Sequence, residues 1–320
     1  TRFRHDVESN LLDLTNAVGN VYRWSYDAVN LPQTFTFPDG SKESYSRDPN
    51  RNLTGFTNRS SQAISAIFDA DNRVIQRTHH ASTNTVFNFG WDDADRLATV
   101  TRSRGSILES TITNRYDAVD RLTEQIQGIY AVRYGYDVAN NVTNIVYPSG
   151  LSVGLSYDSR NLLSAITNST SGAAVANYER NAAGRMTKRT LENGMECLYL
   201  YNAADRVTNI TLRSTANPSN VIQSFAYGHD AVGNRLFVKY KNDRGDVYQH
   251  DKTYQVTGVK YNVANPQDGF AAATNASRTL TCVYDGVGNR TSMGDNGTNT
   301  TYTVNNLDQY TTLTSGLSPP

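Results

Sequence analysis

Three stretches in the middle of the chain follow one pattern: Tyr116-Asp-Ala-Val-Asp-Arg-Leu-Thr123, Tyr136-Asp-Val-Ala-Asn-Asn-Val-Thr143 and Tyr157-Asp-Ser-Arg-Asn-Leu-Leu-Ser164. Each has a Tyr before an Asp, an Asn or Asp three residues after that Asp, and an aliphatic residue two places further on. A unit that recurs in a chain adopts the same local structure each time, so this pattern decides the fold.

Copies of the pattern recur along the whole chain of 320 residues, and most are 20 to 25 residues apart. Their central residues are Asp6, Asn16, Asp27, Asp48, Asp69, Asp92, Asp117, Asp137, Asp158, Asn181, Asn202, Asp230, Asp251, Asp285 and Asn305. The two longest gaps hold insertions near 213–221 and 262–278, and their Asn, Pro, Gly and Ala content predicts surface loops. We predict a single repeat array over 1–320 with no separate catalytic domain.

The central Asp or Asn predicts a tight turn, because its side chain can accept hydrogen bonds from the backbone just after it. Three residues later, twelve of the fifteen copies carry Gly, Asn or Asp, which tolerate a left-handed backbone. A type I turn followed by one left-handed residue is a common hairpin connection. A second turn is predicted midway through several repeats, at Pro38-Asp-Gly40, Pro148-Ser-Gly150, Asn193-Gly194 and Arg244-Gly245.

Aromatic residues precede the turns at two fixed positions. They stand one residue before the central Asp or Asn in eight copies and three residues before it in ten. A two-residue step places both rings on one face of a strand. Two turns per repeat then give two short antiparallel strands per repeat, or roughly thirty strands. Because twisted sheets rarely exceed about ten strands without curling, we predict an all-β ribbon of hairpins wound into a spiral, shell or tube.

Composition excludes several classes of protein. The 30 Lys and Arg balance 30 Asp and Glu, so no net field attracts nucleic acid or anionic lipid. No apolar run of about 18 residues exists to span a bilayer. The start, Thr-Arg-Phe-Arg, does not form a signal peptide, so we expect a mature form or a fragment. Two cysteines form neither a disulfide framework nor a zinc-binding cluster.

The repeated string Y-D-x-x-(G/N/D)-(R/N)-L-T resembles the YD-repeat or Rhs-repeat family, over nearly the whole chain from Asp6 to about Tyr310. The resemblance implies a spiralling strip of β-hairpins from a large secreted or surface-associated protein. In toxin complexes and Rhs toxins of bacteria such strips form a shell that encloses a toxic domain, and in teneurin-type adhesion receptors they form a rigid scaffold.

The chain departs from the toxin-type pattern in one respect. It has no segment rich in D-P-x-G, which in those proteins plugs the shell and contains an aspartyl self-cleavage site, and it has no toxin domain. Both ends look like ordinary repeats. Since bare end strands invite pairing, we expect each end to meet further repeats of the same chain or an identical subunit.

Candidate catalytic groups are better explained as structural ones. His5, His229 and His250 stand in the aromatic position before the central Asp, which predicts half-buried structural roles. His79 and His80 are neighbours, and neighbouring residues on a strand face opposite ways, which disfavours a shared metal. Cys197 and Cys282 are predicted to be buried apolar thiols, because no partner His is implied by spacing.

The carboxylates allow one alternative. Asp69, Asp71, Asp92, Asp93 and Asp95 could suggest a calcium site, but they lack the calcium-binding repeat and the twelve-residue loop that ends in Glu. Solvated turns remain the preferred interpretation. We therefore predict no catalytic, cofactor-binding or metal-binding residues and no cofactor.

Arginine is frequent one place after the left-handed turn position, at Arg73, Arg96, Arg121, Arg185 and Arg206. Arg suits bidentate pairing with carboxylates and stacking on rings. We predict that these residues pair with the motif Asp and Tyr of adjacent repeats in ladders along the ribbon. A sugar-binding surface of Tyr and Arg is the functional alternative.

The sequence thus predicts a non-enzymatic extracellular or cell-surface protein with a structural role. The favoured hypothesis is a shell or scaffold segment of a large secreted protein, with an enclosed cargo domain as a partner. A self-assembling filament, tube or sheath subunit is the second hypothesis, and a carbohydrate-binding adhesin with glycan partners is the third. Nucleic-acid binding and membrane insertion are not expected.

Overall fold

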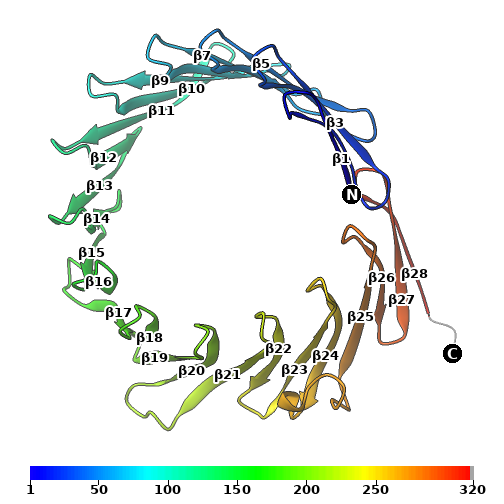
Figure 1. Cartoon of the computed structure of the whole chain (residues 1–320). Coiled ribbons are helices and arrows are strands. Elements are labelled where there is room, and N and C mark those ends of the chain that lie inside the picture. The colour runs from blue at the N-terminus through cyan, green and yellow to red at the C-terminus, as the bar shows by residue number, and fades with distance from the viewer. Residues whose placement is uncertain (318–320) are drawn as a thin grey trace. The chain divides into compact units, whose positions relative to one another are not determined.

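The computed structural model describes residues 1–317, which form 28 short strands and one 3-10 turn (Figure 1). The first strands are β1 (Arg2–His5), β2 (Leu11–Thr15), β3 (Val21–Tyr26), β4 (Pro32–Thr36), β5 (Lys42–Arg47), β6 (Leu53–Thr57), β7 (Ala63–Phe68), β8 (Val74–His79), β9 (Thr85–Trp91), β10 (Leu97–Arg104), β11 (Ile107–Tyr116), β12 (Leu122–Gln127), β13 (Tyr130–Tyr136) and β14 (Val142–Val146). The rest are β15 (Ser152–Tyr157), β16 (Leu163–Asn168), β17 (Ala174–Arg180), β18 (Met186–Leu191), β19 (Met195–Tyr201), β20 (Val207–Ser214), β21 (Val221–His229), β22 (Arg235–Tyr240), β23 (Arg244–His250), β24 (Val256–Ala264), η1 (Pro266–Asp268), β25 (Arg278–Tyr284), β26 (Arg290–Asp295), β27 (Thr298–Val304) and β28 (Tyr310–Leu317).

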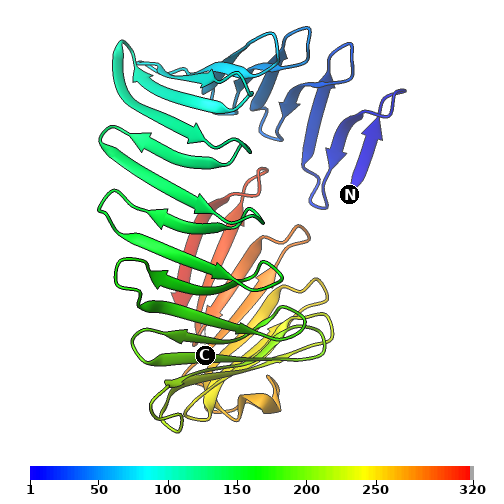
Figure 2. The ribbon, with the colours of Figure 1, turned by 90° about the vertical axis from the view of Figure 1, so that its left-hand side faces the viewer.

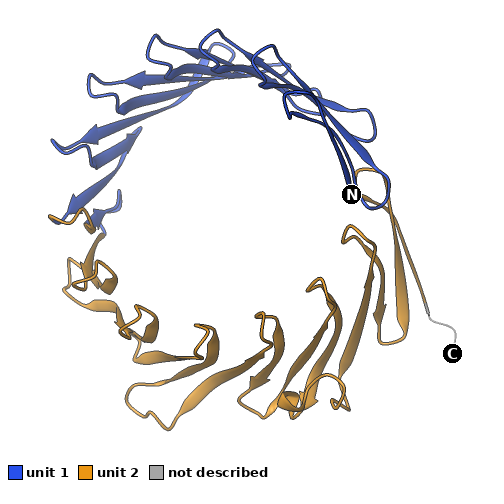
Figure 3. Cartoon of the chain, viewed as in Figure 1, with its two compact units in different colours: residues 1–137, 144–151 blue, residues 138–143, 152–320 orange. Residues whose placement is uncertain are grey.

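The chain divides into two compact units (Figure 3). Unit 1 comprises residues 1–137 and 144–151, and unit 2 comprises 138–143 and the described residues from 152 onward. Inside unit 1 the strands from β1 to β13 pair in chain order, each antiparallel to the next, and inside unit 2 the same holds from β15 to β28. The predicted all-β ribbon of antiparallel hairpins is confirmed.

The turns have the predicted chemistry. At Asp27 the carboxylate Oδ1 accepts hydrogen bonds from the N–H groups of Val29 (3.0 Å) and Leu31 (2.9 Å), and the N–H of Asn30 donates to the Asp27 carbonyl (3.1 Å). The residue three places after the central one has a positive φ in all fifteen copies. These residues are Ser9, Gly19, Asn30, Arg51, Asn72, Asp95, Asp120, Asn140, Asn161, Gly184, Asp205, Gly233, Tyr254, Gly288 and Asp308.

Three of these left-handed positions carry residues that do not favour the conformation: Ser9, Arg51 and Tyr254. A left-handed backbone costs an ordinary L-residue about 1–2 kcal/mol. The repeat therefore imposes the turn even where the local residue opposes it, since the flanking strands and the Asp hydrogen bonds fix the backbone.

Replacing Tyr254 should relieve this cost. Tyr254 has φ 68° and is 59% exposed, so little packing is lost with the ring. Tyr254→Asn is expected to raise the free energy of unfolding by about 0.5–1 kcal/mol, because Asn tolerates the left-handed region. Urea denaturation followed by circular dichroism measures the change. Tyr254→Ala lacks the side-chain amide with which Asn can hydrogen-bond the nearby backbone, so it should give no gain, and an equal gain from Ala would contradict this explanation.

One motif copy lies on the other edge of its ribbon. Consecutive antiparallel strands place successive turns at opposite ends, so the turns alternate between the two edges (Figure 2). Asn16 closes the hairpin of β2 and β3, whereas Asp6 and Asp27 close the hairpins on either side of it. Asn16 thus forms a turn on the edge opposite to the other motif turns, within a repeat, and does not mark a further repeat. Asn58 forms the same kind of turn on that edge, with Ser61 left-handed (φ 62°), and it was not among the predicted motif copies.

Most of the predicted midway turns are present, and one was misplaced. Gly40, Gly150 and Gly194 are left-handed, as such turns require. The turn predicted at Arg244-Gly245 is wrong, because the left-handed residue is Asp243 (φ 64°) and Gly245 lies inside β23. There the absent side chain allows close approach of the neighbouring strand, since a Cβ on Gly245 would lie 1.9 Å from the Val238 carbonyl oxygen.

Few residues are fully buried, and the one buried hydrophobic cluster found in the described residues lies in unit 2. Val247 of β23, Val263 of β24 and Ala273 form it, with Phe237 and Phe270 packed against it. The segment between β24 and β25 supplies Ala273 and Phe270, and its Pro266 is fully buried. The prediction of a surface loop here was therefore wrong for these residues. Their apolar side chains cover the sheet, which the Asn, Pro and Gly content had obscured.

No helix within residues 1–317 is long and apolar enough to cross a membrane.

Candidate functional site

The candidate site is a ladder of side chains that joins each repeat to the one before it. In many repeats the side chain directly before the central Asp or Asn donates a hydrogen bond to a backbone carbonyl of the preceding repeat. The acceptor lies five residues after the central Asp or Asn of the previous turn on the same edge. Tyr157 Oη donates in this way to the Val142 carbonyl and Tyr201 Oη to the Met186 carbonyl, both at 2.8 Å. The other donor and acceptor pairs of this kind are Tyr26 and Leu11, Trp91 and Val74, Tyr116 and Leu97, Tyr136 and Leu122, and Tyr284 and Val256.

The same position can be filled by arginine. Arg47 Nη1 donates to the Pro32 carbonyl (2.6 Å), and Arg180 Nη2 donates to the Leu163 carbonyl (3.3 Å). The common property of this column is therefore a donor at the end of a long side chain, and the aromatic ring is one way to provide it. Phe68 occupies the column without a donor.

Burial accompanies these bonds. Burial is the largest cause that raises the pKa of Tyr136 and of Tyr284 above the usual value. Both groups are thus held neutral, in the state that donates to a carbonyl.

Removal of one hydroxyl tests the tyrosine column. Tyr136→Phe leaves the Leu122 carbonyl without its donor at 2.7 Å, and we expect the free energy of unfolding to fall by about 1–2 kcal/mol. Phe68→Tyr adds the missing donor opposite the Leu53 carbonyl and should raise stability by about 1 kcal/mol. Urea denaturation of both variants is the measurement. Equal effects of the same sign from the two substitutions would contradict the assigned role of the hydroxyl.

The second part of the ladder is the arginine one place after the left-handed residue. Arg96 Nε donates to the carboxylate of its own Asp92 (2.8 Å), and Arg96 Nη1 donates to the carboxylate of Asp120 in the next repeat (2.7 Å) and to the carbonyl of Asp117 (3.1 Å). Its guanidinium carbon lies 4.8 Å from the ring centroid of Tyr116. One arginine thus joins two neighbouring turns of the same edge and covers the tyrosine between them.

Equivalent residues repeat this arrangement. Arg73 pairs with Asp69 and Asp95 and lies over Trp91, Arg121 pairs with Asp117 and lies over Tyr136, Arg185 pairs with Asp205 and lies over Tyr201, and Arg206 donates to the carbonyls of Asp230 and Ala231. Asn takes the same position in other repeats, where its side-chain amide donates a hydrogen bond to the left-handed residue of the next repeat. These donor and acceptor pairs are Asn10 and Asn30, Asn52 and Asn72, Asn141 and Asn161, and Asn289 and Asp308. The predicted Asp, Tyr and Arg ladders are confirmed, and Asn is an equivalent that sequence reasoning had not assigned.

Four of the five carboxylates proposed as a calcium alternative, all except Asp93, contact arginine within the described residues. Arg73 contacts Asp69 (2.7 Å), Asp71 (3.2 Å) and Asp95, and Arg96 contacts Asp92 (2.8 Å). Guanidinium groups therefore stand where a cation would compete for the same oxygens. In the part of the chain that the structure describes, no group of three His, Cys, Asp or Glu is arranged to hold a metal ion.

The histidines have different surroundings. His229 and His250 are half-buried as predicted, and the Nδ1 atom of each is buried without a hydrogen-bond partner among residues 1–317. His5 is exposed, so the prediction was wrong there, because in the described chain β1 pairs with β2 alone. His80 Nε2 lies 2.8 Å from Ser65 Oγ, and the His79 ring lies 5.5 Å from the Phe87 ring.

The thiols are only partly as predicted. Cys197 is buried, at 7% exposed, but its surroundings are not purely apolar, because Arg189 Nη2 lies 3.7 Å from its Sγ. Cys282 is half-buried, which corrects the prediction of a buried thiol. Both are free. Arg189 reaches Cys197 because the two residues are directly opposite on β18 and β19.

The fold and the ladder define an antiparallel β-hairpin repeat protein. Residues 136–174 match the family model described as RHS Repeat, and this segment contains the motifs at Tyr136 and Tyr157. The resemblance to YD or Rhs repeats drawn from the motif string is confirmed. No curated protein sequence matches the chain significantly.

Solved structures share the fold. The crystal structure of TcdB2-TccC3-TEV matches with a TM-score of 0.74 at 16% identity over 96% of this chain, and that of TcdB2-TccC3 with 0.74 at 17% over 95%. The structure of the Tc holotoxin pore of Photorhabdus luminescens matches with 0.63 at 15% over 95%. This chain spans 18%, 18% and 19% of those chains respectively, so the likeness concerns one part of much larger proteins.

Proposed function

We propose that the chain is a non-enzymatic segment of the wall of a large extracellular or cell-surface Rhs-type protein, in which 1–320 act as one repeat array. The observation that carries the proposal is the ladder. Its tyrosines and arginines connect neighbouring repeats along one edge within each unit, so many of the polar groups that could have formed a site are used to hold repeats together.

The electrostatics of the turns support a structural role for the carboxylates. Asp69 has a lowered pKa, mainly because the Arg73 side chain donates to it, and Asp117 has a lowered pKa, mainly because the Arg121 N–H donates to it. A carboxyl group kept ionised and occupied by donors is a poor general acid, since catalysis needs a pKa near the working pH.

The comparisons add a context for such a wall. The matched structures belong to Tc toxin proteins, and the resemblance implies that a wall of this type encloses a cargo domain. We extend this to the present chain as a casing or scaffold role, with further repeats as its immediate partners.

Electron microscopy and analytical ultracentrifugation of the purified chain test the proposal. We expect uniform single-copy particles. Long uniform tubes or filaments would overturn the proposal in favour of a self-assembling sheath. A glycan array run on the same sample should show no specific binding, and selective binding of one glycan class would instead assign the Tyr and Arg surface to adhesion.

A further inference from the structure

Unit 1 contains a strand whose edge is left open for part of its length. Strand β11 has ten residues, and its pairing with β10 extends to its first residue, Ile107, which lies opposite Arg104. On its other side β12 pairs with it only from Ile112, opposite Gln127, because the chain turns back there into β13. Residues 107–111 therefore have no partner strand on this side among the described residues. Backbone N–H and C=O groups on alternate residues of a strand point toward each neighbour, so those of 107–111 that point to this side face no strand.

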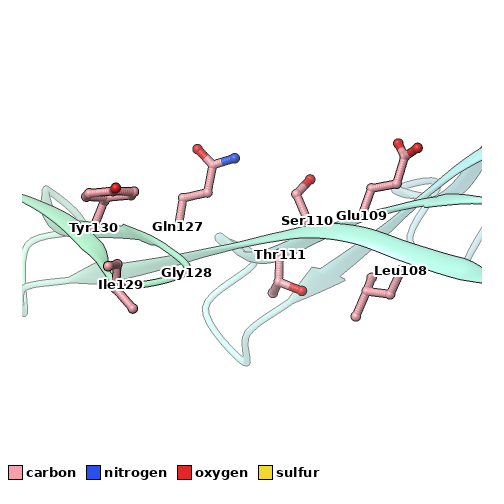
Figure 4. Close-up of a pocket in the computed structure, with 8 residues that line it drawn as sticks. All are labelled: Leu108, Glu109, Ser110, Thr111, Gln127, Gly128, Ile129 and Tyr130. Atoms are coloured by element: carbon pink, nitrogen blue, oxygen red, sulfur yellow. The ribbon is translucent and has the colours of Figure 1, made fainter.

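A groove of about 660 Å³ lies along this open edge, lined by residues 108–111 of β11 and 127–130 of the next hairpin. Its two faces differ (Figure 4). The side chains of Glu109, Ser110, Gln127 and Tyr130 lie on one face, and those of Leu108, Thr111 and Ile129 lie on the other. Glu109 and Ser110 share a face because a β-bulge shifts the register between Arg102 and Ser103 at this point.

The apolar face is unusually exposed. Leu108 is 59% exposed and Ile129 is 91% exposed, on either side of the groove. On the polar face Glu109 accepts from Arg102 Nε and Arg104 Nε, both at 3.0 Å, so two guanidinium groups face one carboxylate. The groove thus has exposed apolar side chains on one face and, on the other, polar side chains that include a carboxylate already paired with Arg102 and Arg104 of β10.

A similar step occurs in unit 2, and there a lysine side chain reaches across part of it. Strand β21 extends beyond the end of β22, because the pairing of the two strands begins at Phe225 and Tyr240. Residues 221–224 therefore have no partner strand on that side in the described chain. The Lys241 ammonium donates to the Val221 carbonyl on this open stretch. Lysine at an exposed strand edge is a known means of preventing strand addition. The edge at 107–111 has Ile129, and no lysine, in the corresponding hairpin turn.

We propose that the open edge at 107–111 binds an extended peptide segment, which adds to β11 as a strand in line with β12. Rows of N–H and C=O groups at strand spacing are matched by another extended backbone, and alternate side chains then enter the two faces. The occupant has apolar side chains toward Leu108 and Ile129 and uncharged polar side chains toward Ser110 and Gln127. Five residues at about 3.3 Å each give a segment of roughly 17 Å.

The probe is a short blocked peptide, acetyl-TVTVTV-amide, whose alternation places valines on one face and threonines on the other. Fluorescence anisotropy measures its binding to the full chain, and amide hydrogen exchange locates it. We expect binding with slowed exchange confined to residues 107–111. The same peptide with alternate amides N-methylated lacks the donors and should not bind.

Ile129→Lys is the matched variant, because it places a lysine in the hairpin turn beside the open edge, as Lys241 lies in the turn beside residues 221–224. Ile129 is almost fully exposed, so the fold should be kept, and circular dichroism checks this. We expect the peptide to bind about tenfold more weakly, as loss of one edge hydrogen bond and of an apolar contact implies. Ile67→Lys, the same change at an exposed isoleucine of β7, should leave the affinity unchanged.

Three results would overturn the proposal. They are the absence of peptide binding at millimolar concentration, equal binding by the wild type and Ile129→Lys, and slowed exchange outside residues 107–111. Slowed exchange of 107–111 by oligosaccharides but not by the peptide would also overturn it and would assign the groove to glycans.

Discussion

Gly245→Ala is expected to lower the free energy of unfolding by about 3 kcal/mol, among the largest effects of any single methyl group in this chain. An added Cβ would lie 1.9 Å from the Val238 carbonyl oxygen, 2.8 Å from Pro266 Cγ and 2.9 Å from Lys239 Cα. Two of these atoms belong to the backbone and one to a rigid ring, so no side-chain rotation relieves the clash. The strands β22 and β23 would have to separate beside the buried cluster of Val247 and Val263.

Gly90→Ala provides the control for this substitution. A Cβ on Gly90 would lie 2.3 Å from Thr99 Oγ1, a hydroxyl that rotates away, and 4.0 Å from the nearest backbone oxygen. We expect a change within about 1 kcal/mol, because Ala also restricts the unfolded chain. Urea denaturation of both variants, followed by circular dichroism, gives the comparison. Similar stabilities for the two would show that the β22 and β23 spacing at Gly245 is not fixed.

Acid is expected to unfold the chain through the turns. The carboxyl pKa is lowered from 3.8 in nine motif aspartates: Asp6, Asp27, Asp69, Asp92, Asp117, Asp158, Asp230, Asp251 and Asp285. A group whose pKa is lower in the folded state stabilises the fold above its unfolded pKa, and this contribution is lost as pH falls through the folded pKa. Stability should therefore be retained above about pH 4 and fall steeply below it, since nine turns protonate in one window.

Asparagine turns supply the control. Asn202 Oδ1 accepts from the N–H groups of Ala204 and Arg206 (both 3.0 Å), which is the turn geometry without a titrating group. The double variant Asp27→Asn and Asp158→Asn should keep the turns and move the acid unfolding transition to lower pH. Thermal unfolding at a series of pH values is the measurement. An acid transition that stays at the wild-type pH would exclude these turns as its cause.

Much of the fold follows from the sequence because the motif specifies local structure. The Asp and the residue three places later predict the turn, including the left-handed backbone in the copies that carry Gly, Asn or Asp there. At Arg51 and Tyr254 the residue type opposes that backbone, and only the recurrence of the motif indicates it. Aromatic spacing predicts the strands, and Arg96 and its equivalents predict the ladder of charges.

Other features have no sequence signal. The acceptor of each Tyr hydroxyl is a backbone carbonyl, which any residue supplies, so the bond from Tyr157 to Val142 cannot be found from residue types. Gly245 looks like a turn glycine until the neighbouring strand is in place. The open edge of β11 arises from unequal strand lengths and from a bulge, both of which depend on pairing partners.

The central claim is that each repeat is held by its neighbour through the ladder. Amide hydrogen exchange at strand resolution in the wild type and in Tyr136→Phe tests it most directly. Tyr136 belongs to β13 and its acceptor Leu122 to β12, so we expect faster exchange in these two strands, while β3 to β5 stay as in the wild type. Unchanged exchange in β12, or a uniform increase across unit 1, would contradict the account.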